Sequence, residues 1–195
     1  FLLLAAFATL VLGMGLPTTG AYVVAASVTI PPMTLYGFSA LSAHMFVFFF
    51  AILSAITPPV CVAVYVGAAI AQANWLKVAK EALRISLMKY ILPFIMLYNV
   101  SLLFDGGFWL TLLSTVGVIL LSFATESLCF YYMIKKLSLA EAALGVCAVV
   151  LLVAALGLVS FDTLAIRLVC GLAGALLVAV MLLSNFWRRP AAARQ

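Results

Sequence analysis

Charged residues are scarce in this sequence. Only 8% of its 195 residues are charged, 68% are hydrophobic, and the mean hydropathy is +1.35. A soluble domain carries about 25% charged residues on average, so this composition excludes a water-soluble globule. The apolar stretches are long and continuous instead of alternating with polar residues, which excludes a membrane β-barrel. The composition therefore predicts an all-α, polytopic protein of the lipid bilayer.

Residues that carry chemistry are equally scarce. The chain has one histidine and five acidic residues, and it contains no HExxH, GxSxG or CxxC motif. An enzyme within the membrane needs a nucleophile and base, or metal ligands, that face one another, and little here could form one. The cysteines all lie in apolar segments, so we interpret them as packing residues that imply neither a metal site nor a disulfide. They are Cys61, Cys129, Cys147 and Cys170.

The net charge of +5 is concentrated between apolar runs and is no sign of nucleic-acid binding. Basic residues gather at 77–89, at 135–136 and in the tail at 188–194. We interpret each remaining apolar run as one crossing, namely 90–104, 108–134, 139–160 and 163–186. This path places nine of the ten basic residues on one face, which the positive-inside rule makes cytoplasmic. The exception, Arg167, follows Asp162 by five residues and is expected to snorkel to the opposite interface.

The chain begins at Phe1 inside an apolar run, without an initiator methionine or the basic stretch that opens a signal peptide. We therefore interpret it as the C-terminal part of a longer protein. Its predicted organisation is a pair of interrupted elements at 1–72, a surface helix and a crossing at 73–104, three C-terminal transmembrane helices at 105–187 and a basic cytoplasmic tail at 188–195.

The segment WLKVAKEALRISLMK, residues 75–89, predicts an amphipathic helix that lies along the cytoplasmic membrane surface. Charged side chains occupy one face of this helix. Its apolar face consists of Leu76, Ala79, Leu83 and Leu87. The helix is either a simple linker or a brace between moving parts, and both interpretations stay open.

An interrupted helix precedes that segment. Residues 41–72 are more than the about 20 that one straight span requires, and Pro58 and Pro59 divide them. The prolines donate no N–H and clash with the preceding turn, so they release backbone carbonyls around Ser54 to Ile56. Freed carbonyls persist in a membrane only where protein buries them or a wet cavity receives them. Together with the hydroxyl of Thr57, they are typical oxygen ligands of a coupling cation.

A second interruption, GMGLPTTG, occupies residues 13–20. The apolar stretch after it extends only to Pro31–Pro32 and then reaches a turn near Tyr36–Gly37, which is short for a crossing. We therefore predict a re-entrant hairpin over residues 1–36. Its tip, Gly15 to Thr19, lies near the membrane centre, and both arms open to the outer side.

The composition of this tip favours ligand binding. Its glycines permit unusual backbone angles and close approach, and Thr18 and Thr19 supply hydroxyls and helix N-terminal amides. The alternative is a proline-kinked helix whose threonines bond back to their own backbone. The second break, some 40 residues later, favours the hairpin, because paired interruptions in successive segments indicate a transporter binding site.

Three segments resemble a known family. GMGLPTTGAYV, AHMFVFFFAILSAITPPV and ILPFIMLYN, in this order, make residues 1–104 similar to the large membrane subunit of tripartite ATP-independent periplasmic (TRAP) transporters. The branch resembled most is the fused permease whose partner is a TAXI-type binding protein. Gly20 departs from that branch, which more often has alanine there. Residues 105–195 match only loosely, as the extra C-terminal helices that such permeases carry.

The resemblance implies an elevator-type secondary carrier in a bacterial or archaeal inner membrane. A periplasmic substrate-binding protein would deliver an organic acid, and a sodium gradient would drive its import. One half of the site would come from this chain and the other half from an N-terminal inverted repeat. Carbonyls at the breaks and a hydroxyl of Ser54 or Thr57 would bind sodium, and Thr18 and Thr19 would face the substrate carboxylate. The implied site residues are Gly13, Gly15, Pro17, Thr18, Thr19, Ser54, Ile56, Thr57, Pro58 and Pro59.

Two ionisable residues within apolar runs are further candidates, since such residues are expensive in a membrane. His44 has no carboxylate nearby in sequence and so forms no proton relay by itself. Glu126 lies nine residues before Lys135, about 13 Å deeper along a helix, and either pairs with a neighbouring helix, is protonated or faces a cavity. We expect a structural bond for Glu126.

There is one further alternative for the chain as a whole. It could be a non-transporting membrane scaffold or a truncated fragment of a carrier. An upstream apolar half with its own Gly, Pro and Thr interruptions, and a neighbouring gene for a secreted binding protein, would favour the transporter. Gly171 and Ala175 have small-xxx-small spacing, which only hints at close helix packing.

Overall fold

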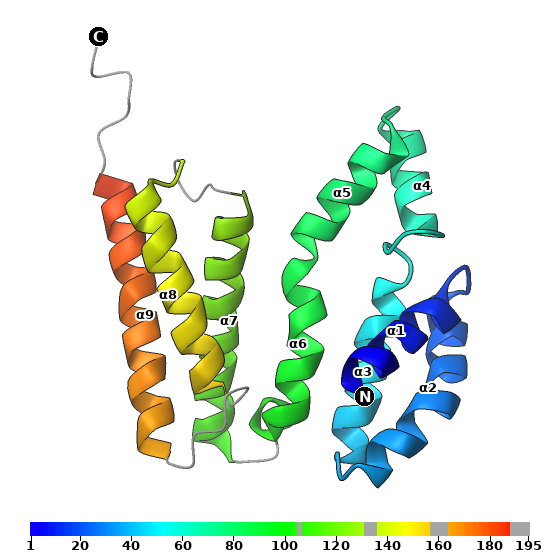
Figure 1. Cartoon of the computed structure of the whole chain (residues 1–195), viewed down its shortest axis with the longest axis horizontal. Coiled ribbons are helices and arrows are strands. Elements are labelled where there is room, and N and C mark those ends of the chain that lie inside the picture. Colours follow the sequence, from blue (N-terminus) through cyan, green and yellow to red (C-terminus); the bar gives the residue numbers. More distant parts are fainter. Residues whose placement is uncertain (105–106, 131–135, 157–163, 188–195) are drawn as a thin grey trace. The chain divides into compact units, whose positions relative to one another are not determined.

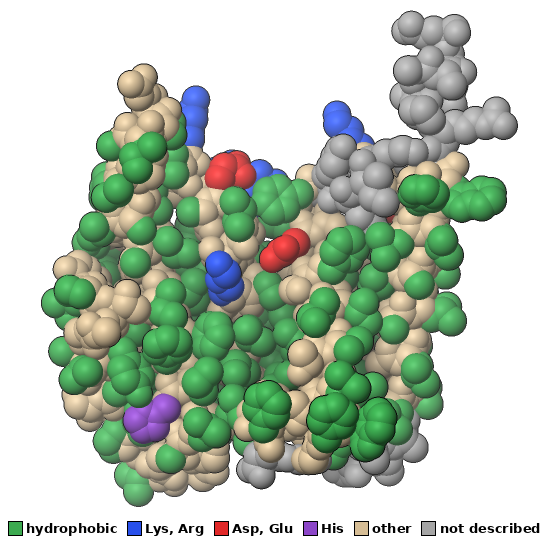
Figure 2. Space-filling model, turned by 180° about the vertical axis from the view of Figure 1, so that it is seen from behind, with side chains coloured by type: hydrophobic (Ala, Val, Ile, Leu, Met, Phe, Trp, Pro, Cys, Tyr) green, Lys and Arg blue, Asp and Glu red, His purple; other side chains and the backbone are tan. Residues whose placement is uncertain are grey.

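The computed structural model describes residues 1–104, 107–130, 136–156 and 164–187, which fold into helices (Figure 1). They belong to two compact units, Phe1–Gly106 and Gly107–Gln195, and each unit is described by itself. Lys135, Asp162 and the basic tail lie outside the described residues. Hydrophobic side chains cover most of the visible surface and charged ones are sparse, as Figure 2 shows, which agrees with a membrane protein.

Helices long enough to span a membrane lie in the second unit. Of the described helices, Phe108–Phe130 and Arg167–Trp187 are long and apolar enough to cross a bilayer. A third candidate is the pair Val62–Ile70 and Trp75–Tyr98, which is bent by 117° at a short break. The all-helical prediction is therefore confirmed, with two or three candidate spans.

The first unit begins with a helical hairpin. α1 (Leu2–Gly13) has 12 residues and is about 18 Å long, well short of a roughly 30 Å hydrocarbon core. The chain turns at residues 14–17 and returns as α2 (Thr18–Leu35), which packs against α1. The turn after α2 falls at Tyr36, as predicted.

α2 continues as a helix through Pro31 and Pro32, where the apolar stretch of the sequence ends, to Leu35. Ile30 and Met33, on either side of the prolines, are both buried against the core. The hydroxyl of Thr34 donates to the Pro31 carbonyl at 2.8 Å. Tertiary packing and hydroxyl bonding of this kind allow a membrane helix to pass through proline.

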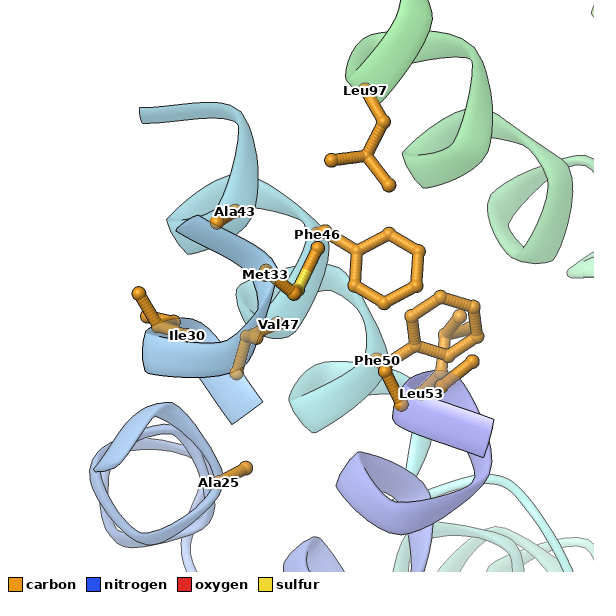
Figure 3. Close-up of a cluster of buried hydrophobic side chains, with 11 residues drawn as sticks. Ala25, Ile30, Met33, Ala43, Phe46, Val47, Phe50, Leu53 and Leu97 are labelled. Atoms are coloured by element: carbon orange, nitrogen blue, oxygen red, sulfur yellow. The ribbon is translucent and has the colours of Figure 1, made fainter. Parts of the chain in front are cut away.

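The core of this unit lies between α2, α3 (Ala40–Leu53) and α6 (Leu87–Tyr98). Phe94 on α6 meets Phe46 and Phe50 edge to face, with ring centroids 5.3 and 5.7 Å apart. Figure 3 shows the buried side chains converging from α2, α3 and α6. The labelled members are Ala25, Ile30, Met33, Ala43, Phe46, Val47, Phe50, Leu53 and Leu97.

The predicted interruption of residues 41–72 is present. α3 ends at Leu53, an irregular segment covers residues 54–61, and α4 (Val62–Ile70) resumes the path. We call residues 54–61 the break. The helix already ends before the first proline, because the i+4 donor that each carbonyl near Ser54 needs is missing or displaced.

The amphipathic helix ends earlier than predicted. α5 (Trp75–Ile85) stops at Ser86, and the residues after it belong to α6. Of the expected apolar face, Ala79 is buried and Leu83 half-buried, whereas Leu76 and Leu87 are exposed. Ala79 forms a small buried cluster with Cys61 and Val64, and Ile56 of the break packs against it. α5 is therefore more than a connecting segment, because it contacts the break through its apolar side.

The second unit contains α7 (Phe108–Phe130), α8 (Leu139–Ala155) and α9 (Leu164–Trp187), and α8 packs against both neighbours. A capping box starts α8: the Ser138 hydroxyl accepts from the Glu141 N–H at 3.2 Å, and the Glu141 carboxylate accepts from the Ser138 N–H at 2.7 Å. Arg167, near the start of α9, is exposed.

Close packing of α8 and α9 depends on Gly174. A Cβ there would lie 2.8 Å from the Cγ of Leu152, a fully buried side chain, and 3.4 Å from the Ala148 carbonyl. We expect Gly174→Ala to lower the free energy of unfolding by about 1–3 kcal/mol, the usual cost of overpacking. Thermal unfolding in detergent micelles measures this effect.

Gly171→Ala is the matched control. Its Cβ would lie 3.5 Å from that of Ala155, an ordinary contact, and alanine is the better helix former by about 1 kcal/mol. Gly171→Ala should therefore leave stability unchanged or raise it. Equal effects of the two substitutions would contradict the packing described here.

Candidate functional site

The two interruptions of the first unit contact each other. The Ser54 hydroxyl, buried in the break, donates to the Gly13 carbonyl at the end of α1 at 3.1 Å and to the Ala51 carbonyl at 2.7 Å. Gly13 is buried, and a Cβ on it would lie only 2.6 Å from the Ser54 oxygen. Glycine is thus required for this approach, and the hairpin and the break form one structural feature.

Only some of the backbone carbonyls in and beside the break accept hydrogen bonds. The Leu53 carbonyl accepts from the N–H groups of Ile56 and Thr57, both at 3.1 Å, and the Ala55 carbonyl accepts from the Ala63 N–H at 3.1 Å. Within the described residues, no hydrogen bond ends on the carbonyls of Ser54, Ile56 or Thr57. The carbonyls of Pro58, Pro59 and Val60 likewise accept no hydrogen bond from the described residues, so the first three are part of a larger set of carbonyls in the break.

Thr57 joins the break to α6. Its hydroxyl lies 2.6 Å from the Leu53 carbonyl and 2.6 Å from the phenol oxygen of Tyr90. Pro58 beside it is half-buried and Pro59 is exposed. Sequence reasoning missed Tyr90, because nothing in its own segment places it beside a residue 33 positions earlier.

The hairpin tip has a different character. Gly15 has a φ of 76°, a left-handed conformation that favours glycine. Pro17, Thr18 and Thr19 are exposed, and α2 starts at Thr18 without a side-chain cap. Among the described residues, no hydrogen bond joins either threonine hydroxyl to the break. The tip therefore presents free amides and hydroxyls to its surroundings.

His44 pairs with an aromatic residue of the hairpin. Its Nδ1 lies 2.6 Å from the Tyr22 hydroxyl, which links α3 to α2, and the Tyr22 ring meets Phe48 edge to face. His44 is exposed at the surface of this unit. Tyr22 could not be singled out from the sequence, since the two residues lie on different helices.

The second unit has two carboxylates of contrasting surroundings. Glu126 is half-buried on α7, and the structural bond expected for it is not among the interactions of the described residues. Glu141 is 3% exposed, and besides capping α8 it accepts from the Ser184 hydroxyl of α9 at 3.1 Å. The S-x-x-E pattern at Ser138 was the overlooked signal for it. Across the described residues, no three His, Cys, Asp or Glu side chains gather to hold a metal ion.

The apolar helices, and the contact between the two interruptions, define a polytopic α-helical membrane protein with discontinuous helices. Residues 1–109 match the family model described as "Tripartite ATP-independent periplasmic transporter, DctM component". The match covers more than half of the chain, and the chain belongs to this family of transporter permeases, which is not enzymatic. Membership implies a periplasmic binding protein as partner. No curated protein and no solved structure matches the chain.

Proposed function

We propose that this chain supplies one half of the ion and substrate site of a secondary transporter that imports an organic acid with sodium. The observation that carries the proposal is the contact between the two interruptions, Gly13 to Ser54, beside carbonyls that accept no hydrogen bond from the part of the chain that the structure describes. Discontinuous membrane helices whose ends meet form the binding sites of many secondary carriers.

Sodium is a hard cation that favours oxygen ligands, and the break offers them without any carboxylate. The carbonyls of Ser54, Ile56 and Thr57 and the Thr57 hydroxyl are the proposed ligands. Because the ligands are neutral, a bound cation would add net positive charge, which favours simultaneous binding of an anionic substrate. This coupling is what a symporter requires.

The substrate carboxylate would bind at the hairpin tip. α2 begins at Thr18, so the N–H groups of its first turn and the hydroxyls of Thr18 and Thr19 point out of an exposed helix end. Such an end favours an anion through its free donors and its dipole. An N-terminal inverted repeat would complete the site, and movement of both repeats together would give an elevator-type cycle.

The remaining proposals concern placement in the cell. The hairpin opens outward, residues 41–72 start outside and end on the cytoplasmic side, and the C-terminal tail is cytoplasmic, following the positive-inside rule. The partner would be a TAXI-type binding protein, as for fused permeases of this family. If the complete permease and its binding protein take up no carboxylate in the following experiment, the alternative of a non-transporting scaffold is favoured.

We expect Thr57→Ala to abolish sodium-dependent uptake while the protein stays folded, because one oxygen ligand and its link to α6 are lost. The assay uses proteoliposomes that hold the complete permease and its binding protein, a pool of ¹⁴C-labelled mono- and dicarboxylates, and an inward gradient of sodium or of choline. Folding is checked by gel filtration and thermal unfolding.

Thr29→Ala is the matched control, since the Thr29 hydroxyl bonds to the carbonyl four residues earlier at the same 2.6 Å but has no link to the break. It should keep sodium-dependent uptake. Uptake that is indifferent to sodium, and equal in both variants, would make the break a structural kink and would overturn the sodium assignment.

A further inference from the structure

Tyr90 occupies a position that the proposed function does not yet use. It lies on α6, is half-buried, and its ring packs against Phe50 of the core with centroids 6.4 Å apart. Its hydroxyl reaches out of that apolar setting to the Thr57 oxygen at 2.6 Å. A tyrosine combines an apolar body with a polar tip, so this placement fixes the hydroxyl from the core side.

The direction of the hydrogen bond follows from a count of protons. The Thr57 hydroxyl has one proton and two lone pairs. The Leu53 carbonyl, 2.6 Å away, can only accept, so the Thr57 proton points to it. Tyr90 must then donate its proton to one lone pair of the Thr57 oxygen.

This arrangement leaves one lone pair on Thr57, with its direction fixed by the other two bonds. In a threonine without hydrogen-bond partners the hydroxyl proton turns about the Cβ–Oγ bond, so its lone pairs have no fixed direction. Here the Leu53 carbonyl and Tyr90 hold it from two sides. The remaining lone pair is therefore oriented before any ligand arrives, which lowers the cost of binding a cation.

We propose that Tyr90 is a positioning residue of the sodium site, which acts through Thr57 and sets the affinity for sodium without being a ligand itself. The inference rests on the proposed function of the break. It adds a third element, α6, to a site otherwise formed by the hairpin and the break.

The test is Tyr90→Phe in the complete permease, which keeps the aromatic ring and removes only the hydroxyl. We expect the sodium concentration for half-maximal uptake to rise about threefold to tenfold, the range for loss of one hydrogen bond between membrane helices. The KM for the labelled carboxylates at saturating sodium should stay unchanged. Sodium-dependent thermal stabilisation, measured against choline at constant ionic strength, should shift to higher sodium by the same factor.

Tyr98→Phe is the control on the same helix. Tyr98 is 52% exposed, and its hydroxyl makes no hydrogen bond within the described residues, so its removal should change neither readout. If Tyr90→Phe behaves like this control while Thr57→Ala abolishes the sodium response, the inference is wrong and the proposed function stands. If Tyr90→Phe lowers maximal uptake and stability at an unchanged sodium affinity, Tyr90 is only structural and the inference is equally overturned. If Thr57→Ala also leaves the sodium response intact, both proposals fail.

Discussion

Gly13→Ala is expected to abolish uptake and to lower the thermal stability of the permease. The added Cβ would lie 2.6 Å from the Ser54 oxygen, 3.0 Å from the Ser54 Cβ and 3.3 Å from the Ala21 Cβ. The Ser54 oxygen can rotate away about χ1, but the Cβ atoms of Ser54 and Ala21 belong to two different elements and do not move without their backbone. The tip of the hairpin and the break would have to separate.

The expected loss of folding stability in Gly13→Ala has two contributions. Overpacking of a tight contact costs about 1–3 kcal/mol, and loss of the Ser54 to Gly13 hydrogen bond costs about 1 kcal/mol more. The functional loss should exceed what this destabilisation implies, because a displacement of about 1 Å at a binding site reduces activity far more than it reduces folding. Carboxylate uptake and thermal unfolding of the same preparation measure the two effects.

Two companion variants sharpen this test. In the double variant Gly13→Ala/Ser54→Gly, the two closest atoms are gone, so part of the uptake and stability should return. Gly20→Ala, in the first turn of α2, meets no atom closer than 4.0 Å, and it should behave like the wild type. Full activity of Gly13→Ala would show that the hairpin and the break need not touch.

The sequence could predict where the chain breaks but not what the breaks touch. Proline removes a donor and glycine permits unusual angles wherever they occur, so the interruptions at residues 13–20 and 54–61 follow from local chemistry. The bond between Gly13 and Ser54 joins residues 41 positions apart, and no local rule selects it. Tyr90 was missed for the same reason, because its phenol lies beside Thr57 only in the folded chain, where α6 packs on α3.

Local rules also failed where packing opposes them. Pro31–Pro32 reads as a helix end, yet Ile30 and Met33 are held in the core on either side and the helix continues. The amphipathic pattern continues to Lys89, yet the helix ends at Ile85, because the chain turns into α6 and buries Met88. In both places the competing factor is tertiary contact, which propensity does not contain.

Glu141→Ala is expected to destabilise the second unit strongly. The carboxylate is almost fully buried, and its hydrogen bonds include those from the Ser138 N–H at 2.7 Å and from the Ser184 hydroxyl at 3.1 Å. Bonds to a charged group contribute about 1.5–3 kcal/mol each, and bonds between membrane helices fall at or below the lower end. A loss of about 2–4 kcal/mol is expected, which lowers the melting temperature by roughly 4–16 °C.

Two controls test whether the effect is specific to the buried carboxylate of Glu141. Glu81→Ala removes an exposed carboxylate that pairs with Arg84 at 3.2 Å on the same helix, and it should change stability by less than about 0.5 kcal/mol. Glu141→Gln keeps the size of the side chain and one acceptor oxygen, so its stability should fall between those of the wild type and Glu141→Ala.

The glutamine variant also decides whether Glu141 is structural. A carboxylate that only caps α8 and fastens it to α9 should affect uptake in proportion to the amount of folded protein. A carboxylate that takes part in transport by exchanging protons cannot be replaced by an amide, however well the protein folds. Glu141→Gln that is folded, stable and inactive would therefore move part of the mechanism into the C-terminal helices, whereas uptake that follows stability would confine the mechanism to the hairpin and the break.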